Sequence, residues 1–271
     1  MAIKKIITSG CSFTDIKFSD TWPCVLKEKY PNIDFDFLGL ESSGNELIQK
    51  RATLAVTEAL TQYQPEEILV IVMWSTHDRK TFFLDLHQVK DLIDYWKNDN
   101  SPFNVSFQFT DLKTKLKNPI VIEKPNKNAT IMRASMSDGW FNLHNSHGTQ
   151  FCKLFYNDIH NLTAGINITL ENILFLNMFC EKHNVKVVNT FIMDSQLEFI
   201  QSSNHQINKH LANEFSKLDI VPAIHDYLNT FNDNSLFRDD KQHPNWEGHQ
   251  LYVDNLLLPW IHKKYSILLP S

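Results

Sequence analysis

The six-residue run at 68–73, Ile-Leu-Val-Ile-Val-Met, constrains the fold of this chain more than any other stretch. The run is continuous and apolar, and it is rich in β-branched residues. A strand with no polar alternation is typical of a parallel sheet, because helices cover both faces of such a sheet. The run therefore predicts a central strand of an α/β protein.

The segments before this run alternate between strand-like and helix-like patterns. Strands are expected at 3–8 and 33–38, and helices at 22–30 and 45–63. The resulting order, strand-helix-strand-helix-strand, is typical of a parallel sheet with right-handed crossovers. We therefore expect a central parallel sheet of about five strands with helices on both of its faces.

The rest of the chain contains one long interruption of this pattern. The stretch 98–160 has little periodicity and many Asn, Lys and Pro residues. A structureless loop of that length is uncommon inside a compact domain, so we expect an insertion with structure of its own, acting as a lid or shaping the substrate site. Helices are then expected at 169–183, 207–218 and 245–264, and a strand at 185–193, with Pro259 kinking the last helix. Residues 1–271 are expected to form a single domain with this insertion.

The balance of charges argues against one class of partner. The 271-residue chain carries 26 Lys and Arg residues against 31 Asp and Glu residues, which gives a net charge of −5. Binding to nucleic-acid phosphates needs a basic face, and the sequence contains no Lys and Arg block of that size. We therefore expect no nucleic-acid partner.

Neither the cysteines nor the apolar runs indicate export or membrane insertion. The four cysteines form no C-x-x-C motif, as expected of reduced thiols. The first residues lack the apolar region of a signal peptide, and no apolar run approaches the length of a membrane span. These features predict a cytoplasmic protein without a membrane partner, and they indicate nothing about its oligomeric state.

Three polar clusters follow predicted strands or open a predicted helix. They lie at 10–14, at 42–45, where Asn45 is expected to cap the helix, and at 74–79. Ligands of open α/β sheets bind at the carboxyl ends of the strands, and all three clusters fall on that edge. We therefore expect the functional site there.

Three residues from opposite ends of the chain can form a hydrolytic site. A hydrolytic nucleophile needs a base within hydrogen-bond reach and a third group that orients the base. Ser12 follows the first strand, and Asp240 and His243 precede the last helix, so Asp240 can hold one imidazole nitrogen while the other faces Ser12. Taken alone, each of these residues is more often a turn residue or a helix cap, and the prediction depends on their combination. Cys11 is a competing nucleophile.

Together these clusters resemble the sequence blocks of the SGNH, or GDSL-like, hydrolase family over most of the chain. The first block of that family, Gly-Asp-Ser-x-Ser/Thr, is matched by residues 10–14, with Cys11 in place of Asp, a form similar to virus- and bacterium-encoded members. Gly44 matches the glycine of the second block, and residues 240–244 match the last block, Asp-x-x-His-Pro, in full. The chain lacks the G-x-S-x-G motif of the α/β-hydrolases, so that family is the poorer match.

The third block departs from the family pattern. The family has Gly-x-Asn-Asp there, whereas this chain has Ser75-Thr76-His77-Asp78. The resemblance implies that His77 donates a hydrogen bond to the oxyanion in place of the asparagine. The hydroxyls of Ser75 and Thr76 are alternative donors. A structural role for His77, with weak or altered activity, is the remaining alternative.

The resemblance implies a three-layer α/β/α flavodoxin-like fold and hydrolysis of a small acyl ester, such as an acetyl group on a carbohydrate, through an acyl-enzyme. Ser12, His243 and Asp240 are then the catalytic triad, and the N–H groups of Ser12 and Gly44, with His77, form the oxyanion hole. No metal ion or organic cofactor is implied. Two alternatives stay open: acyl transfer with the same triad, and a non-catalytic binding or virion structural protein. A virus-encoded chain would be found in the virion or the host cytoplasm.

A few further residues have both a functional and a structural interpretation. Trp74 and Arg79 follow the central strand and are candidate substrate contacts, although Trp74 can equally pack at the strand end and Arg79 can pair with Asp78. His144 and His147 lie three residues apart but lack the Cys or carboxylate partners of a recognisable metal site. We expect no metal centre.

Overall fold

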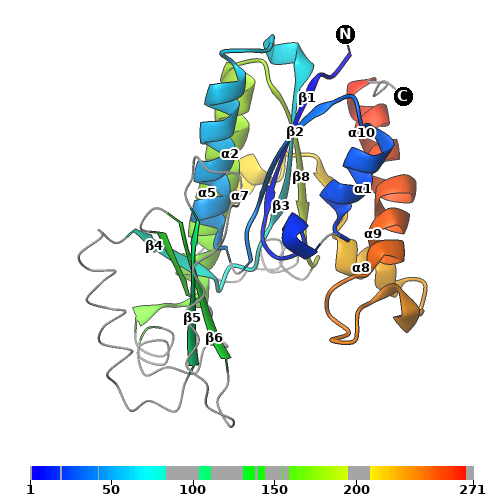
Figure 1. Ribbon diagram of the computed structural model, residues 1–271. Coiled ribbons are helices and arrows are strands. Elements are labelled where there is room, and N and C mark those ends of the chain that lie inside the picture. Colours follow the sequence, from blue (N-terminus) through cyan, green and yellow to red (C-terminus); the bar gives the residue numbers. More distant parts are fainter. Residues whose placement is uncertain are drawn as a thin grey trace.

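A five-stranded parallel sheet forms the centre of the molecule (Figure 1). The computed structural model describes residues 2–18, 20–41, 43–83, 104–110, 131–137, 140–143, 155, 159–194 and 208–266. The strand order is β2-β1-β3-β8-β9, and each of these pairings is parallel. The strands are β1 (Lys5–Gly10), β2 (Asp34–Gly39), β3 (Ile68–Trp74), β8 (Lys186–Phe191) and β9 (Ile220–Val221). The predicted α/β class and central sheet are confirmed.

Helices cover both faces of the sheet, so the protein has three layers. One face carries α2 (Asn45–Ala59), α5 (Leu162–Lys182) and α7 (Lys209–Phe215), and the other carries α1 (Trp22–Lys29), α8 (Ile224–Asn229), α9 (Trp246–Tyr252) and α10 (Leu258–Tyr265) (Figure 1). Short helical turns lie at η1 (Ile16–Phe18), η2 (Pro65–Glu67) and η4 (Asn234–Leu236). The expected three-layer architecture is therefore present.

The burial of β3 on both faces explains why its sequence has no polar alternation. All seven of its residues are buried, and alternate side chains enter the two cores on opposite faces of the sheet. Leu69, Ile71 and Met73 pack with the layer of α1 and α9, and Val70, Val72 and Trp74 pack with the layer of α2 and α5. Because both faces are covered by helices, no position of this strand is left for a polar residue.

The strand register brings the polar clusters to one edge. Gly10, the last residue of β1, lies opposite Gly39 of β2 and Met73 of β3. The segments that follow these three strands therefore leave the sheet side by side, at the carboxyl edge where α/β folds bind their ligands.

The C-terminal helical region is interrupted where the sequence predicts a kink. Helix α9 is followed by a π-helical turn, η5 (Val253–Leu257), and α10 begins one residue before Pro259. Proline has no backbone N–H to donate, so the regular hydrogen-bond ladder cannot continue through it. The change of helical type occurs in the residues before Pro259, as a local adjustment of this kind requires.

Three strands from the stretch 98–160 form a second sheet with β4 (Lys80–Phe83), which precedes that stretch. This sheet has the order β4-β7-β6-β5, with β5 (Asn104–Thr110), β6 (Ile131–Ser137) and β7 (Trp140–Leu143). β5 and β6 pair in parallel, whereas β7 runs antiparallel to both β4 and β6. Most other residues of this stretch lie outside the described ranges, so its role as a lid stays a prediction.

Among the described helices, α5 is the one that is long and apolar enough to cross a membrane by length and composition. Length and composition alone do not distinguish a membrane-spanning helix from a helix that packs in a protein core. The apolar α5 residues Ile166, Leu170, Ile173 and Leu176 are buried in the core beneath α2 and the sheet. In this fold α5 packs into the core through these residues, whereas its apolar residues Phe175 and Met178 are exposed.

Candidate active site

Ser12 stands in a tight turn directly after β1. The N–H of Thr14 donates to the C=O of Cys11 at 2.9 Å, which folds the chain back and leaves Ser12 at the sheet edge. The turn requires glycine at position 10, because a Cβ there would lie 2.2 Å from Thr14 Oγ1 and 2.9 Å from the C=O of Met73. The Ser12 side chain is largely buried, with 6% of the residue exposed.

A second turn, between η4 and α9, carries Asp240 and His243. The N–H of Arg238 donates to the C=O of His243, and the N–H of Lys241 donates to the C=O of Arg238, both at 2.8 Å. Lys241 takes the left-handed backbone conformation, with a φ of 54°. This closed turn brings Asp240 and His243 onto the same side, as their three-residue spacing predicts.

The residues after this turn begin α9 and fix its direction. Asn245 is the N-cap, and its Oδ1 accepts from the N–H of Gly248 at 3.0 Å. A Cβ on Gly248 would lie 2.4 Å from the C=O of Leu236, so only glycine allows the helix to pack this closely on η4. The turn with His243 is thus anchored at its C-terminal side.

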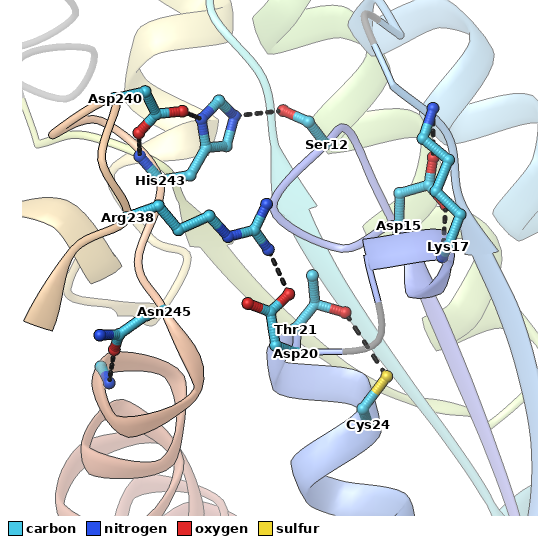
Figure 2. A network of polar contacts seen from close by, with 11 residues as sticks. Ser12, Asp15, Lys17, Asp20, Thr21, Cys24, Arg238, Asp240, His243 and Asn245 are labelled. Atoms are coloured by element: carbon cyan, nitrogen blue, oxygen red, sulfur yellow. Dashed lines mark hydrogen bonds and ion pairs between the residues drawn. The ribbon is translucent and has the colours of Figure 1, made fainter.

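Ser12, His243 and Asp240 form one hydrogen-bonded chain (Figure 2). Ser12 Oγ lies 3.0 Å from Nε2 of His243, and Nδ1 of His243 lies 2.6 Å from Oδ2 of Asp240. The Phe13 ring packs on the imidazole, with centroids 4.7 Å apart. This is the nucleophile, base and orienting carboxylate arrangement that acyl-transfer chemistry uses.

The environment of Asp240 keeps its carboxylate ionised. Partial burial acts to raise the pKa of Asp240, but the N–H groups of His243 and Gln242, with the His243 side chain, together lower it below its ordinary value. Both N–H groups donate to Oδ1 at 2.9 Å, which leaves Oδ2 for the imidazole. An ionised carboxylate is the form that can accept from Nδ1–H and stabilise an imidazolium.

Gly44 and Asn45 lie at the start of α2, on the same sheet edge. The expected Asn45 cap is wrong, because Gly44 is the N-cap and Asn45 is the first helical residue. The Asn45 side chain instead accepts from the N–H of Ser75 at 2.8 Å, and donates to the C=O of Ser75 at 3.1 Å and to Thr169 Oγ1 at 3.0 Å. Asn45 thereby ties the second polar cluster to the third. An asparagine at a helix start carries no sequence signal that separates this role from capping. Ser42 lies outside the described residues.

His77 follows β3 and lies partly buried. Burial lowers the pKa of His77, and the neighbouring Asp78 opposes that shift only in part. The imidazole is therefore neutral near pH 7, with one N–H to donate. Its backbone C=O packs against α5, where a Cβ on Gly165 would approach it to 2.5 Å. The oxyanion role of His77 stays a prediction.

Trp74 and Arg79 differ in what they can contribute. Trp74 is fully buried, and its indole N–H donates to Asn189 Oδ1 at 2.9 Å, so its side chain offers no exposed surface to a substrate. Arg79 is half-buried, and its backbone N–H donates to the C=O of Thr76 at 3.2 Å. Arg79 remains a predicted contact for an anionic substrate group.

No group of three or more His, Cys, Asp or Glu side chains is placed to hold a metal ion within the described part of the chain. His144 and His147 lie outside that part.

Comparisons with known proteins returned structural similarities only. No protein-family model matches the chain, and no curated protein matches it. A lipolytic protein of the G-D-S-L family from Veillonella parvula is 10% identical, with a TM-score of 0.43, over 97% of this chain and 99% of that one. A putative lipolytic protein of the same family from Desulfitobacterium hafniense is 12% identical, with a TM-score of 0.43, over 92% of this chain and 94% of that one. A putative acylhydrolase from Bacteroides fragilis is 12% identical, with a TM-score of 0.41, over 96% and 87%. At such low TM-scores these similarities assign no function. Any functional assignment has to be argued from the geometry of Ser12, His243 and Asp240.

Proposed function

We propose that this protein is a serine esterase of the SGNH, or GDSL-like, type, which hydrolyses a small acyl ester through Ser12, His243 and Asp240. The observation that carries the proposal is the continuous hydrogen-bond chain from Asp240 through His243 to Ser12, at 2.6 Å and 3.0 Å. These residues come from opposite ends of the sequence. Their convergence at the carboxyl edge of the sheet is what a nucleophilic site in this fold requires.

The mechanism follows from the order of the three side chains along this hydrogen-bond chain. His243 Nε2 accepts the proton of Ser12 as Oγ attacks the acyl carbon, and Asp240 stabilises the imidazolium that forms. The N–H groups of Ser12 and Gly44, with His77, hold the oxyanion. His243 then protonates the leaving alcohol, which gives an acyl-enzyme. Next, His243 activates a water molecule, which releases the acid and restores Ser12.

The proposed substrate is an ester of a short acyl group, such as acetyl, on a carbohydrate. The support for this choice is the resemblance of the sequence blocks at Ser12, Gly44 and His243 to the SGNH hydrolases. A small acyl group also suits a nucleophile as buried as Ser12, of which 6% is exposed. No cofactor is needed, because the triad supplies both the nucleophile and the proton transfers.

Hydrolysis of p-nitrophenyl acetate tests the proposal most simply. Ser12→Ala and His243→Ala should each lower kcat/KM by on the order of 10³-fold or more, since the triad works as a unit. His210→Ala is the matched control, because His210 is exposed on α7 and away from the turn with His243. Equal rates in the wild type and both triad variants would reject the esterase and leave a binding or structural protein.

The same assay separates hydrolysis from acyl transfer. Adding an alcohol or a sugar to the wild type should change the overall release of p-nitrophenol little if water is the natural acceptor. A large acceleration, with the acyl group recovered on the added acceptor, would replace hydrolysis by transfer while keeping the triad.

A further inference from the structure

Arg238 lies at the start of the turn that carries Asp240 and His243, and its backbone closes that turn. Its N–H donates to the C=O of His243, and its own C=O accepts from the N–H of Lys241, both at 2.8 Å. The residues that flank this turn, Phe237 and Pro244, form an isolated antiparallel β-bridge. Any displacement of the Arg238 backbone is therefore passed directly to His243.

The Arg238 side chain leaves this turn and reaches the N-terminal segment (Figure 2). Its Nη2 donates to Oδ1 of Asp20, which is 218 positions away in the sequence. The guanidinium also lies over the Phe18 ring, with Cζ 4.9 Å from the ring centroid. The contact is partly buried, with 24% of the Arg238 side chain and 27% of the Asp20 side chain exposed.

Asp20 belongs to the short segment that joins the Ser12 turn to α1. Thr21, the next residue, is the N-cap of that helix. The ion pair therefore joins the loop after Ser12 to the turn with His243. The 3.0 Å hydrogen bond between Ser12 and His243, the packing of Phe13 on the imidazole and the Arg238 guanidinium over Phe18 cross the same gap.

We propose that Arg238 is a positioning residue that sets the distance between Ser12 and His243 by tying their two loops together through Asp20. The inference rests on the esterase function proposed above. Proton transfer between Ser12 and His243 needs a short distance and an aligned geometry, and displacement by about 1 Å can cost about 100-fold in rate. Measuring the free energy of unfolding beside kcat separates an effect of this ion pair on geometry from an effect on folding.

The contact has a single N–H···O link, so a lysine can maintain it. Nη2 alone is bonded to Asp20 Oδ1, without the paired geometry that only arginine can supply. Arg238→Lys should then keep most of the activity, whereas Arg238→Met, which preserves the apolar stem but not the charge, should not. Asp20→Asn removes the pair from the other side and leaves the turn with His243 untouched.

Lys29 and Asp254 provide a matched control. They form an ion pair of similar exposure, 33% and 35%, that also joins the N-terminal region to the C-terminal region, at 2.9 Å, but from α1 to η5. Lys29→Met removes this pair without touching either catalytic loop. Comparing Arg238→Met and Asp20→Asn with Lys29→Met therefore removes the general effect on kcat of losing one ion pair between the two regions.

The experiment measures kcat, KM and the free energy of unfolding for the five proteins with p-nitrophenyl acetate. Arg238→Met and Asp20→Asn should each lower kcat by about 10-fold to 100-fold with KM nearly unchanged. Arg238→Lys should stay within a few-fold of the wild type, and Lys29→Met should match it. If the wild type is active and Arg238→Met and Asp20→Asn behave like Lys29→Met, the positioning role is wrong while the esterase stands. An inactive wild type would instead overturn the esterase and, with it, this role.

Discussion

His77 is the residue whose role distinguishes this site most from the family that the sequence resembles. Burial lowers its pKa, so at neutral pH it is an uncharged imidazole with one N–H. A neutral donor can stabilise an oxyanion without the cost of burying a charge. An asparagine amide can donate in the same way, which makes the two side chains exchangeable in principle.

Substitutions at His77 test that role. His77→Ala should lower kcat by about 10²-fold to 10³-fold, because an oxyanion donor is lost, and His77→Asn should recover much of that loss. The measurement is steady-state hydrolysis of a short-chain aryl ester at pH 7, with His210→Ala as the control. Full activity in His77→Ala would show that the imidazole does not contact the oxyanion.

His249 is a second histidine whose environment has a measurable consequence. It lies 1% exposed in α9. Burial, with smaller contributions from the charges of Arg238 and His243, lowers the pKa of His249 to about 3. An unfolded chain would bind a proton at this histidine near pH 6.5, so the unfolded state gains protons first as the pH falls. Its neutral form therefore stabilises the fold above about pH 6.5, and that stability is lost progressively down to about pH 3.

Replacing His249 by glutamine should make the protein less sensitive to acid. Between pH 6.5 and pH 5 the wild type should lose about 2 kcal/mol of unfolding free energy through His249, and His249→Gln should lack that component. Urea unfolding of both proteins at the two pH values gives the comparison, with His210→Gln as an exposed control. The prediction fails if the wild type and His249→Gln lose the same free energy.

At the level of elements, the strand-helix order was predictable and the ends of the elements were not. The apolar runs of β1 and β3 identify a parallel sheet because burial on both faces leaves no room for polar residues. Helix α5 begins at Leu162, earlier than the expected residue 169, because Asn161 caps it by accepting from the N–H of Ala164 at 2.8 Å. The apolar stripe before Thr169 is too short to identify those first turns from periodicity.

The polar link between the start of α2 and the segment after β3 was not predictable, because it depends on the single side chain of Asn45. Asn45 is 2% exposed and satisfies both the N–H and the C=O of Ser75. Nothing in the sequence indicates which residue after β3 an asparagine 30 positions earlier will reach. The pairing appears only once the register of the strands is known.

Asn45→Ala should weaken both the fold and the site. The change leaves two buried backbone groups of Ser75 without these partners, which should cost about 1–3 kcal/mol of unfolding free energy. It should also lower kcat, since Ser75 belongs to the third cluster, which also carries His77. Gln49→Ala is a fitting control, because Gln49 lies in the same helix, is also buried, and donates to Thr53 Oγ1 within α2. Equal losses of stability and rate in the two variants would contradict a special role for Asn45.

At the scale of the whole molecule, the site exists because the fold brings the two ends of the chain together. Ser12 and His243 are 231 positions apart, and their contact requires both the first strand and the turn before α9. The sequence predicted this pairing from block resemblance, and the structure places the side chains within hydrogen-bond distance. The catalytic roles of Ser12 and His243 stay predictions. The substrate also stays a prediction, because most of the stretch 98–160 lies outside the described residues.

Labelling with a fluorophosphonate identifies the nucleophile of the native protein, because the reagent phosphonylates the activated side chain. After treatment with a fluorophosphonate, intact mass and peptide mapping should show one adduct, on Ser12, in the wild type. Labelling should be absent in Ser12→Ala and much slower in His243→Ala. An adduct that persists in Ser12→Ala, or that maps to Cys11, would show that Ser12 is not the nucleophile.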